Sequence, residues 1–430
     1  MKKILSIILV AFMILGLVAC GNSETEEETP FVYEPALDKT TACKISIVGT
    51  YNNFEALEAE FDRFNEYYPN VELSYTKIDD YNNSIATVLE GKDAPNIFFS
   101  FSWMKGNTAY DSVFAHMENL ADPSLGLNLD CIRPGLLNRD SEGKVLTVPI
   151  FSTSYGMLVN NDLFEKEGLK VPTTLQELID VCAAFREKGY ENPMMGYSKD
   201  LSGCLMNTVV YPIFAASLAE HPEVVALANA KDPSAGEYMR PALETLSRLI
   251  NENCINLENC SKIKDNYTEV ILRFFEGDVP MMICTGDTVS GTGKRESQST
   301  AFKEHPFSYS FTPIPTTDKG GYFLDSTSVQ FSVNNACSNL DMTNEFMRFL
   351  ITKTELNQMA SVKRLITPSK DLSFDKVYAP INDVPSDHVI TPTALGIEDT
   401  LATQVRLASY KVGTGELTID EAVSQYGSLK

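Results

Sequence analysis

Aromatic, amide and carboxylate side chains flank the predicted strands of this 430-residue chain, most of them where a strand ends. An aromatic ring stacks on the apolar C–H face of a sugar ring, while amides and carboxylates hydrogen-bond to its hydroxyl rim. Aromatic side chains mixed with Asn and Asp suit both parts of a sugar ring. The residues are Tyr51, Asn52, Asn53, Phe101, Ser102, Trp103, Tyr155, Thr285, Asp287, Tyr322 and Asp325.

Each of these side chains also has a structural explanation. Trp103, the only tryptophan, could pack in the core, and the same holds for Tyr155. Asp287 and Asp325 are residues that cap loops and turns through their side-chain oxygens. The sequence alone leaves both explanations open.

The first part of the chain alternates strands with helices. An alternating strand at 44–49 precedes a helix whose apolar residues recur every three or four positions from Phe54 to Tyr68. A strand at 71–75, a short helix at 85–89 and a strand at 96–99 follow. This order predicts an α/β fold with parallel pairing through right-handed crossovers. Such sheets bind ligands beyond the carboxyl ends of their strands.

A second α/β region is predicted after Pro149. Strands are expected at 155–160, 279–284, 308–314 and 328–333, and residues 201–273 are mostly helical in pattern. Thr174 and Glu177 have the spacing of a capping box at the start of a helix, as do Thr418 and Glu421. A polar, glycine-containing segment is expected at 285–300.

The N-terminal residues resemble a bacterial lipoprotein signal peptide. Lys2 and Lys3 precede an apolar run that ends at Ala19-Cys20, and this run is shorter than the ~20 residues of a membrane-spanning helix. The resemblance implies cleavage before Cys20, lipidation of its thiol, and a location on the outer face of the cytoplasmic membrane. The acidic segment at 21–43 is predicted to be a flexible tether.

Composition excludes several functions. A net charge of −23 disfavours binding to nucleic acid or to anionic lipid headgroups. The four histidines are dispersed without metal-ligand spacing, and there is no G-x-S-x-G motif. No metal or cofactor is therefore expected. The cysteines lack Cys-x-x-Cys spacing; Cys182 and Cys284 lie in apolar runs, and Cys254 and Cys260 are close enough in sequence to form a disulfide.

Five segments, taken in order, resemble the extracellular solute-binding proteins of ABC importers, most closely the family-1 group of maltose- and oligosaccharide-binding lipoproteins. The strongest match is VPIFSTSYGMLVNNDLFEKEGL at 148–169. One departure is that oligosaccharide binders of this family often have several tryptophans in the cleft, whereas this chain has one. The other matching segments are 66–75, 91–100, 274–287 and 311–335.

The resemblance implies two α/β lobes joined by hinge strands, with the ligand between them. Lobe one would comprise 44–150 plus 312–342, and lobe two 151–311 plus 343–430. The chain would be a monomeric, non-catalytic binding protein that delivers a solute, expected to be a sugar or oligosaccharide, to ABC permease subunits. The alternatives are a surface-anchored glycan hydrolase, with paired carboxylates, and a non-transport adhesin or receptor lipoprotein.

Overall fold

The computed structural model describes residues 31–105, 107–196, 206–261, 267–370 and 375–430. The predicted signal peptide at 1–20, including Cys20, lies outside the described residues. The chain divides into two units, 1–34 and 35–430, and the fold below is that of the second. No helix in the described part of the chain is both long and apolar enough to span a membrane.

A five-stranded sheet forms in the first half of the chain, as predicted. β1 pairs in parallel with β2 and β3, whereas β12, from the second half of the chain, pairs antiparallel with β3 and β4. The strands, in sheet order, are β2 (Val71–Lys77), β1 (Cys43–Gly49), β3 (Ile97–Ser100), β12 (Gln330–Val333) and β4 (Val148–Pro149).

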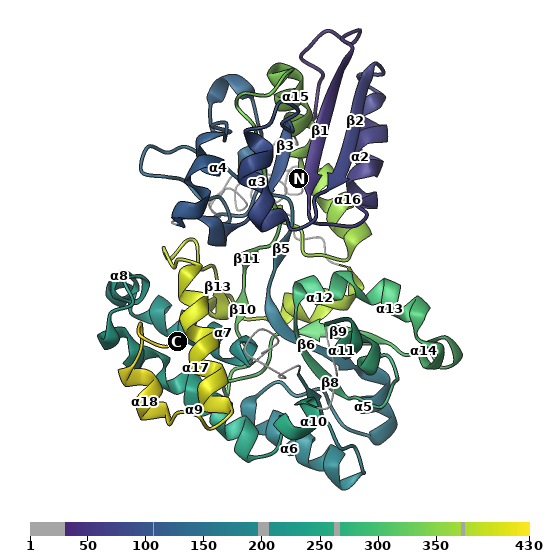
Figure 1. Ribbon diagram of the computed structural model, residues 1–430. Helices are drawn as coiled ribbons and strands as arrows, with labels where there is room; N and C mark the ends of the chain where they lie inside the picture. The colour runs from purple at the N-terminus through teal and green to yellow at the C-terminus, as the bar shows by residue number, and fades with distance from the viewer. Residues whose placement is uncertain (1–30, 106, 197–205, 262–266, 371–374) are drawn as a thin grey trace, which may run out of the picture. The chain divides into compact units, whose positions relative to one another are not determined.

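Five helices accompany this sheet, and together they form what we call lobe one (Figure 1). The predicted helix at 54–68 is α2, and the buried Leu57, Phe61 and Phe64 lie on its inner face. The helices are α2 (Glu55–Asn65), α3 (Tyr81–Leu89), α4 (Asp111–Ala115), α15 (Leu340–Leu350) and α16 (Lys353–Lys363).

A four-stranded sheet forms the centre of lobe two. β6 pairs antiparallel with β8 and β9, and β7 pairs in parallel with β8. Met157 and Val159 face one apolar cluster and Leu158 faces another, so the sheet is buried on both faces. Its strands, in order, are β7 (Met194–Met195), β8 (Met281–Thr285), β6 (Tyr155–Asn160) and β9 (Tyr309–Thr312).

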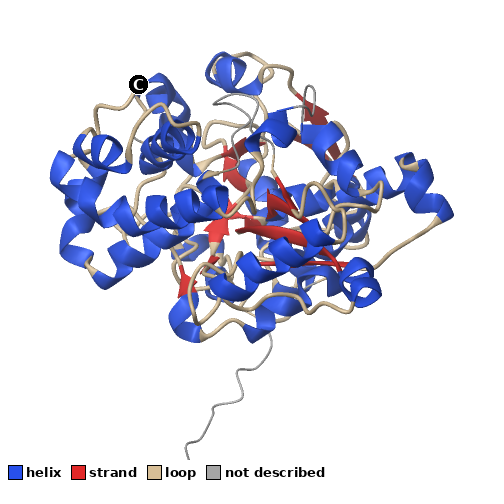
Figure 2. Ribbon diagram, turned by 90° about the horizontal axis from the view of Figure 1, so that it is seen from below, coloured by secondary structure: helices blue, strands red, loops and turns tan. Residues whose placement is uncertain are grey.

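Helices surround the strands of lobe two. Figure 2 shows helices, in blue, on the outside of the molecule and strands, in red, nearer its centre. Residues 286–298, predicted as a polar segment, form two of these helices. The helices are α5 (Asn161–Glu167), α6 (Leu175–Glu187), α7 (Asn207–Glu220), α8 (Val225–Asn229), α9 (Arg240–Asn251), α10 (Leu257–Ser261), α11 (Tyr267–Phe274), α12 (Gly286–Ser290), α13 (Thr292–Gln298), α14 (Thr300–Glu304), α17 (Thr400–Gly413) and α18 (Ile419–Ser424).

The capping predictions differ in outcome. Thr418 and Glu421 form the complete capping box of α18. At α6, Thr174 accepts a hydrogen bond from the Glu177 backbone N–H, but the Glu177 carboxylate accepts from Thr173 instead of from Thr174. Thr174 therefore caps α6 as predicted, but the predicted return hydrogen bond from the Thr174 N–H to the Glu177 carboxylate is replaced by one from Thr173.

Three segments connect the lobes. β5 (Ser152–Thr153) and β11 (Ser326–Thr327) form an antiparallel pair between the two larger sheets (Figure 1). The third segment follows α16, and its Ile366 carbonyl accepts a hydrogen bond from the Ser152 N–H at 2.8 Å. A further parallel pair, β10 (Phe323–Leu324) with β13 (Val389–Ile390), lies in lobe two.

The predicted lobe boundaries are wrong in the second half of the chain. Residues 343–363 were expected in lobe two, but α15 and α16 pack on α2 of lobe one, where Arg63 donates to Glu355 at 2.6 Å. Residues 312–325 were expected in lobe one, but β10 pairs with β13 in lobe two. Amphipathic helices bury one face against any apolar partner, so their sequence pattern does not specify which sheet they cover.

The predicted tether also ends earlier than expected. Residues 35–41 belong to the folded unit and lie against lobe one. The Ala36 N–H donates to Glu345 at 2.9 Å, and the Leu37 N–H donates to the Tyr68 hydroxyl at 3.0 Å. The Tyr68 hydroxyl itself donates to Glu345 at 2.8 Å. The chain thus enters lobe one through a buried acidic residue of α15.

Arg133 binds all three connecting segments. Its Nε and Nη2 donate to the two carboxylate oxygens of Asp325 at 2.8 and 2.7 Å. Nη2 also donates to the Ser152 hydroxyl at 2.7 Å, and Nη1 donates to the carbonyls of Thr367 and Ser369. Both charged groups are buried, so the pair is screened little by solvent.

We expect Arg133→Ala to lower the free energy of unfolding by about 3–5 kcal/mol, because it leaves the Asp325 carboxylate buried without its counter-ion. Urea unfolding followed by circular dichroism measures this loss. Arg139→Ala is the matched control. The Arg139 side chain is exposed and donates a hydrogen bond to the Gly143 carbonyl. A loss no larger than that of the control contradicts the role assigned to Arg133.

Two glutamates meet between α2 and α16. Glu60 is 0% exposed, and Glu355, also buried, is held by Arg63. Burial, followed by the neighbouring Glu355, raises the pKa of Glu60 to about 9. Glu60 is therefore protonated at neutral pH, and Arg63 pairs with Glu355 at 2.6 Å.

The native state binds this proton more tightly than the unfolded state does. The Glu60 contribution to stability is therefore complete below about pH 4.5 and is lost as the pH rises through about 9. Glu60→Gln has no proton to lose, so its stability relative to wild type should increase over that range, by at most ~1.4 kcal/mol per pH unit. Denaturant unfolding at pH 5 and pH 9 tests this, with the exposed Glu58→Gln as control; a constant difference between wild type and Glu60→Gln contradicts it.

Candidate functional site

The charge of Asp287 acts on an aromatic side chain of each lobe. Asp287 is in the first turn of α12, directly after β8 of lobe two. Burial, and then the charge of Asp287, raises the pKa of Tyr51 in lobe one. Burial, then Asp399 and Asp287, raises the pKa of Tyr155 in lobe two. Two other predicted site residues, Tyr51 and Tyr155, thus lie within electrostatic range of Asp287.

The connecting strands hold the Asp287 carboxylate. The Ser328 hydroxyl, next to β11, donates to Asp287 Oδ1 at 2.5 Å. Burial raises the pKa of Asp287, while Ser328 and Thr153 of β5 oppose this rise. A desolvated carboxylate of this kind is a strong acceptor for the hydroxyl or N–H of a ligand.

Ser102 lies at the same junction. Its hydroxyl is 2.9 Å from that of Thr327 in β11, and Gln330 Nε2 donates to it at 2.8 Å. Ser102 also contacts Asp399, the N-cap residue of α17: burial raises the pKa of Asp399, and a hydrogen bond from Ser102 opposes that rise. Ser102 and Asp399 therefore link lobe one to the start of a helix in lobe two.

Trp103 is 38% exposed, which is unusual for the largest apolar side chain. Its ring stacks on Phe101, with centroids 5.8 Å apart and planes inclined by 13°, and contacts Tyr110 edge-on at 5.4 Å. It follows β3, next to Ser102. One side of the ring is thus supported by Phe101, and part of the indole surface is available to a ligand.

Tyr155 and Tyr51 are oriented by their neighbours. Tyr155 opens β6 opposite Thr285 of β8, and its ring contacts that of Tyr211 edge-on at 5.4 Å. The Tyr51 ring packs edge-on against Phe99 at 5.5 Å, and the Lys363 ammonium lies 4.7 Å from its centroid. Asn52 and Asn53 follow Tyr51 and are exposed.

Two predicted residues lie away from this cluster. Both carboxylate oxygens of Asp325 bind Arg133, so this residue belongs to the hinge. The Tyr322 ring packs on His388 with centroids 4.6 Å apart, in a surface hollow that Glu220 and Asp318 also line. We therefore leave Asp325 and Tyr322 out of the site proposed below.

Three residues of the site had no sequence signal that identified them. Asp399 precedes a C-terminal helix, Lys363 ends a helix of lobe one, and Ser328 lies in a connecting segment. None belongs to a motif with recognisable spacing. Asp399 could have been suggested as a helix N-cap, since Asp is preferred at that position.

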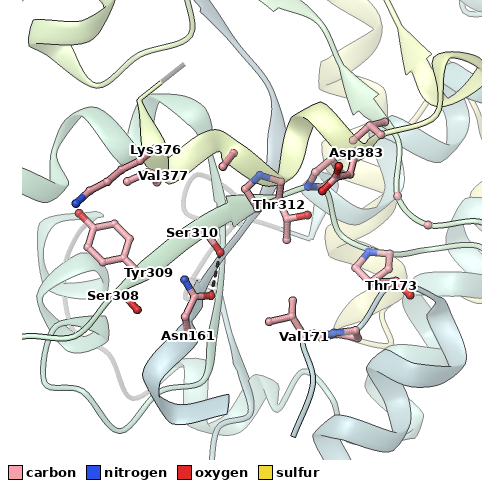
Figure 3. Close-up of a pocket in the computed structure, with 18 of the residues that line it drawn as sticks. Asn161, Val171, Thr173, Ser308, Tyr309, Ser310, Thr312, Lys376, Val377 and Asp383 are labelled. Carbon is pink, nitrogen blue, oxygen red and sulfur yellow. Dashed lines mark hydrogen bonds between the residues drawn. The ribbon is translucent and has the colours of Figure 1, made fainter. Parts of the chain in front are cut away.

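A large cavity lies elsewhere, beside β9 of lobe two. It measures about 930 Å³, and none of its lining residues comes from the sheet of lobe one. Figure 3 shows Asn161, Ser310 and Thr312 facing it, with Ser310 donating to Asn161 at 3.1 Å. It contains none of the predicted site residues. Relative movement of the lobes would not enclose a ligand there, so we place the candidate site at the Asp287 cluster instead.

Within the described residues, no group of three or more His, Cys, Asp or Glu side chains is placed to hold a metal ion. Asp287 and Asp399 are each engaged with hydroxyl groups of the connecting strands or of lobe one. The arrangement of two tyrosines, two carboxylates and hydroxyls suits binding of a polar, ring-containing molecule.

Several solved structures with the same fold have titles that name a sugar or a sugar transporter. Apo RafE from Streptococcus pneumoniae is 17% identical with a TM-score of 0.68, covering 92% of this chain and 98% of its own. The GacH receptor of Streptomyces glaucescens, solved with acarbose, is 18% identical with a TM-score of 0.67. The match covers 90% of this chain and 97% of GacH. A Bacillus licheniformis sugar transporter, solved with stachyose, is 15% identical with a TM-score of 0.62. The match covers 90% of this chain and 100% of the transporter chain.

These likenesses establish the two-lobe fold of periplasmic binding proteins. No curated protein matches the sequence. The family model described as "Bacterial extracellular solute-binding protein" matches residues 49–355, which is most of the chain. The chain therefore belongs to the bacterial extracellular solute-binding protein family.

Proposed function

We propose that this protein is the substrate-binding lipoprotein of an ABC uptake system and captures a sugar or oligosaccharide between its lobes. The observation that carries the proposal is the position of Asp287, which approaches Tyr51 of lobe one and Tyr155 of lobe two. The sugar ligands of RafE, GacH and the Bacillus licheniformis transporter support the same ligand class.

The proposed site consists of Trp103 and Tyr155 as stacking surfaces, with Ser102, Asp287 and Asp399 as hydrogen-bonding groups; Tyr51, Asn52 and Asn53 form its rim. A ligand that contacts both lobes at once favours the form in which they are closest, because it gains contacts only there. The protein then presents both lobe surfaces to the permease. It acts as a monomer, needs no cofactor and catalyses no reaction.

A thermal-shift screen tests this function. The chain from residue 21 to 430 is heated with mono- and oligosaccharides, and with amino acids, peptides and polyamines as controls. A native-state ligand at 100 times its Kd adds about 2.7 kcal/mol, which raises the Tm measurably. Shifts with one sugar class support the proposal. Shifts only with a control class would reject a carbohydrate as the ligand. No shift with any compound would favour a non-transport receptor. Turnover of a glycan would indicate a hydrolase.

Trp103→Ala should weaken binding of the sugar identified in that screen by about 1–3 kcal/mol, a typical loss for removing an aromatic stacking surface. Isothermal titration calorimetry gives the Kd. Tyr322→Ala is the matched control, because Tyr322 lies against His388 away from the cluster. Equal affinities of wild type and a folded Trp103→Ala variant would remove Trp103 from the site.

The proposed lipid anchor depends on Cys20. When the full chain is expressed in a Gram-positive host, the wild type should be found in the membrane fraction. Cys20→Ala should not be lipidated and should lose the acyl chains that hold the protein there. Fractionation followed by immunoblotting measures the distribution. The same membrane-bound fraction for both forms would show that Cys20 does not anchor the protein.

A further inference from the structure

Two buried cysteines of lobe two lie in the same apolar cluster. Cys182 lies on the inner face of α6 and Cys254 lies just after α9, and both are 0% exposed in the same apolar cluster. Each thiol acts on the pKa of the other, which requires the two sulfurs to be close together. The sequence suggested a different partner for Cys254, namely Cys260, whose side chain lies outside the described part of the chain.

A second contact fixes the loop of Cys254 against α6. Arg186 is one helical turn after Cys182, and its Nη1 donates to the Asn253 carbonyl at 2.8 Å. The Cys254 N–H donates to the Leu249 carbonyl at 2.8 Å, and Asn253 has a left-handed φ of 55°. The peptide before Cys254 is therefore held from both α6 and α9, on the side of α6 that carries Cys182.

We propose that Cys182 and Cys254 form a disulfide bond when the exported chain folds in the presence of a disulfide oxidant. The family to which the chain belongs is extracellular, and disulfides persist in oxidising surroundings outside the cytoplasm. The bond would join α6 to the end of α9 across the core of lobe two. The proposal does not depend on which solute the protein binds.

The chemistry is a thiol–disulfide exchange. The thiolate of one cysteine attacks a sulfur of the oxidant, RSSR, forms a mixed disulfide and releases RS⁻. The thiolate of the other cysteine then attacks the protein sulfur of that mixed disulfide and displaces the second RS⁻. The two thiol protons end on the released thiolates as two RSH, so that RSSR gains the two electrons that the cysteines lose.

The local charges favour Cys254 as the first nucleophile. The hydrogen bond from Cys182 lowers the pKa of Cys254 against the effect of burial, and the positive charge of Arg186 lowers it further. The same hydrogen bond, together with burial, raises the pKa of Cys182. Because both thiols are inaccessible in the native state, the first step occurs while the chain folds.

Peptide mapping tests the proposal. The chain from 21 to 430 is refolded with oxidised glutathione, treated with iodoacetamide and digested with trypsin, which separates residues 171–186 from residues 249–262. We expect one linked species of these two peptides, which dithiothreitol resolves. Because 249–262 contains both Cys254 and Cys260, the link should persist in Cys260→Ala and disappear in Cys254→Ala.

The oxidised wild type should also melt several degrees above the reduced form, because the crosslink restricts the unfolded chain. Cys284→Ala removes a different buried thiol and should keep both the link and the shift. Loss of the link in Cys260→Ala, or alkylation of both Cys182 and Cys254 after oxidation, would overturn the proposal. If Cys254→Ala fails to fold, mapping of the wild type and of Cys260→Ala still decides it.

Discussion

The guanidinium group of Arg133 binds every segment that connects the two lobes. β5 and β11 are only two residues long, so few backbone hydrogen bonds hold them together. Arg133 adds further hydrogen bonds between the segments, through its charge pair with Asp325 and its bonds to Ser152, Thr367 and Ser369. Separating these charges inside the protein is costly, because neither can be solvated by water there. The connecting segments consequently keep their spacing at this point.

The candidate site is built outward from this junction. Asp287 is bound by Ser328, which directly follows β11, and is approached by Thr153 of β5, so the position of its carboxylate depends on where these strands lie. Lobe two adds a rigid support, because its sheet is packed on both faces and presents Tyr155 and Thr285 as a paired edge. The groups of lobe one, Tyr51 and Ser102, come from the ends of β1 and β3.

The features predicted correctly from the sequence are those that depend on residues close together along the chain. The helix at 55–65 and the strands at 155–160 and 281–285 follow from local periodicity, which needs no knowledge of the partner. The lobe assignment of α15 and α16 failed because an apolar helix face fits either sheet. The role of Asp325 was equally out of reach, because its partner lies 192 residues earlier in the chain. Asp399 and Cys254 are further cases, in which the decisive neighbour is distant in sequence.

The binding of residues 36 and 37 by Glu345 and Tyr68 has a mechanical consequence. Any force applied to the N-terminal segment reaches lobe one through Glu345 of α15 and through Tyr68, which follows α2. In a protein held by that segment, lobe one would be the stationary half, and any approach of the lobes would carry lobe two towards it. Trp103, Ser102 and Tyr51 would then stay in place, and Tyr155 and Asp287 would travel towards them as the lobes approach.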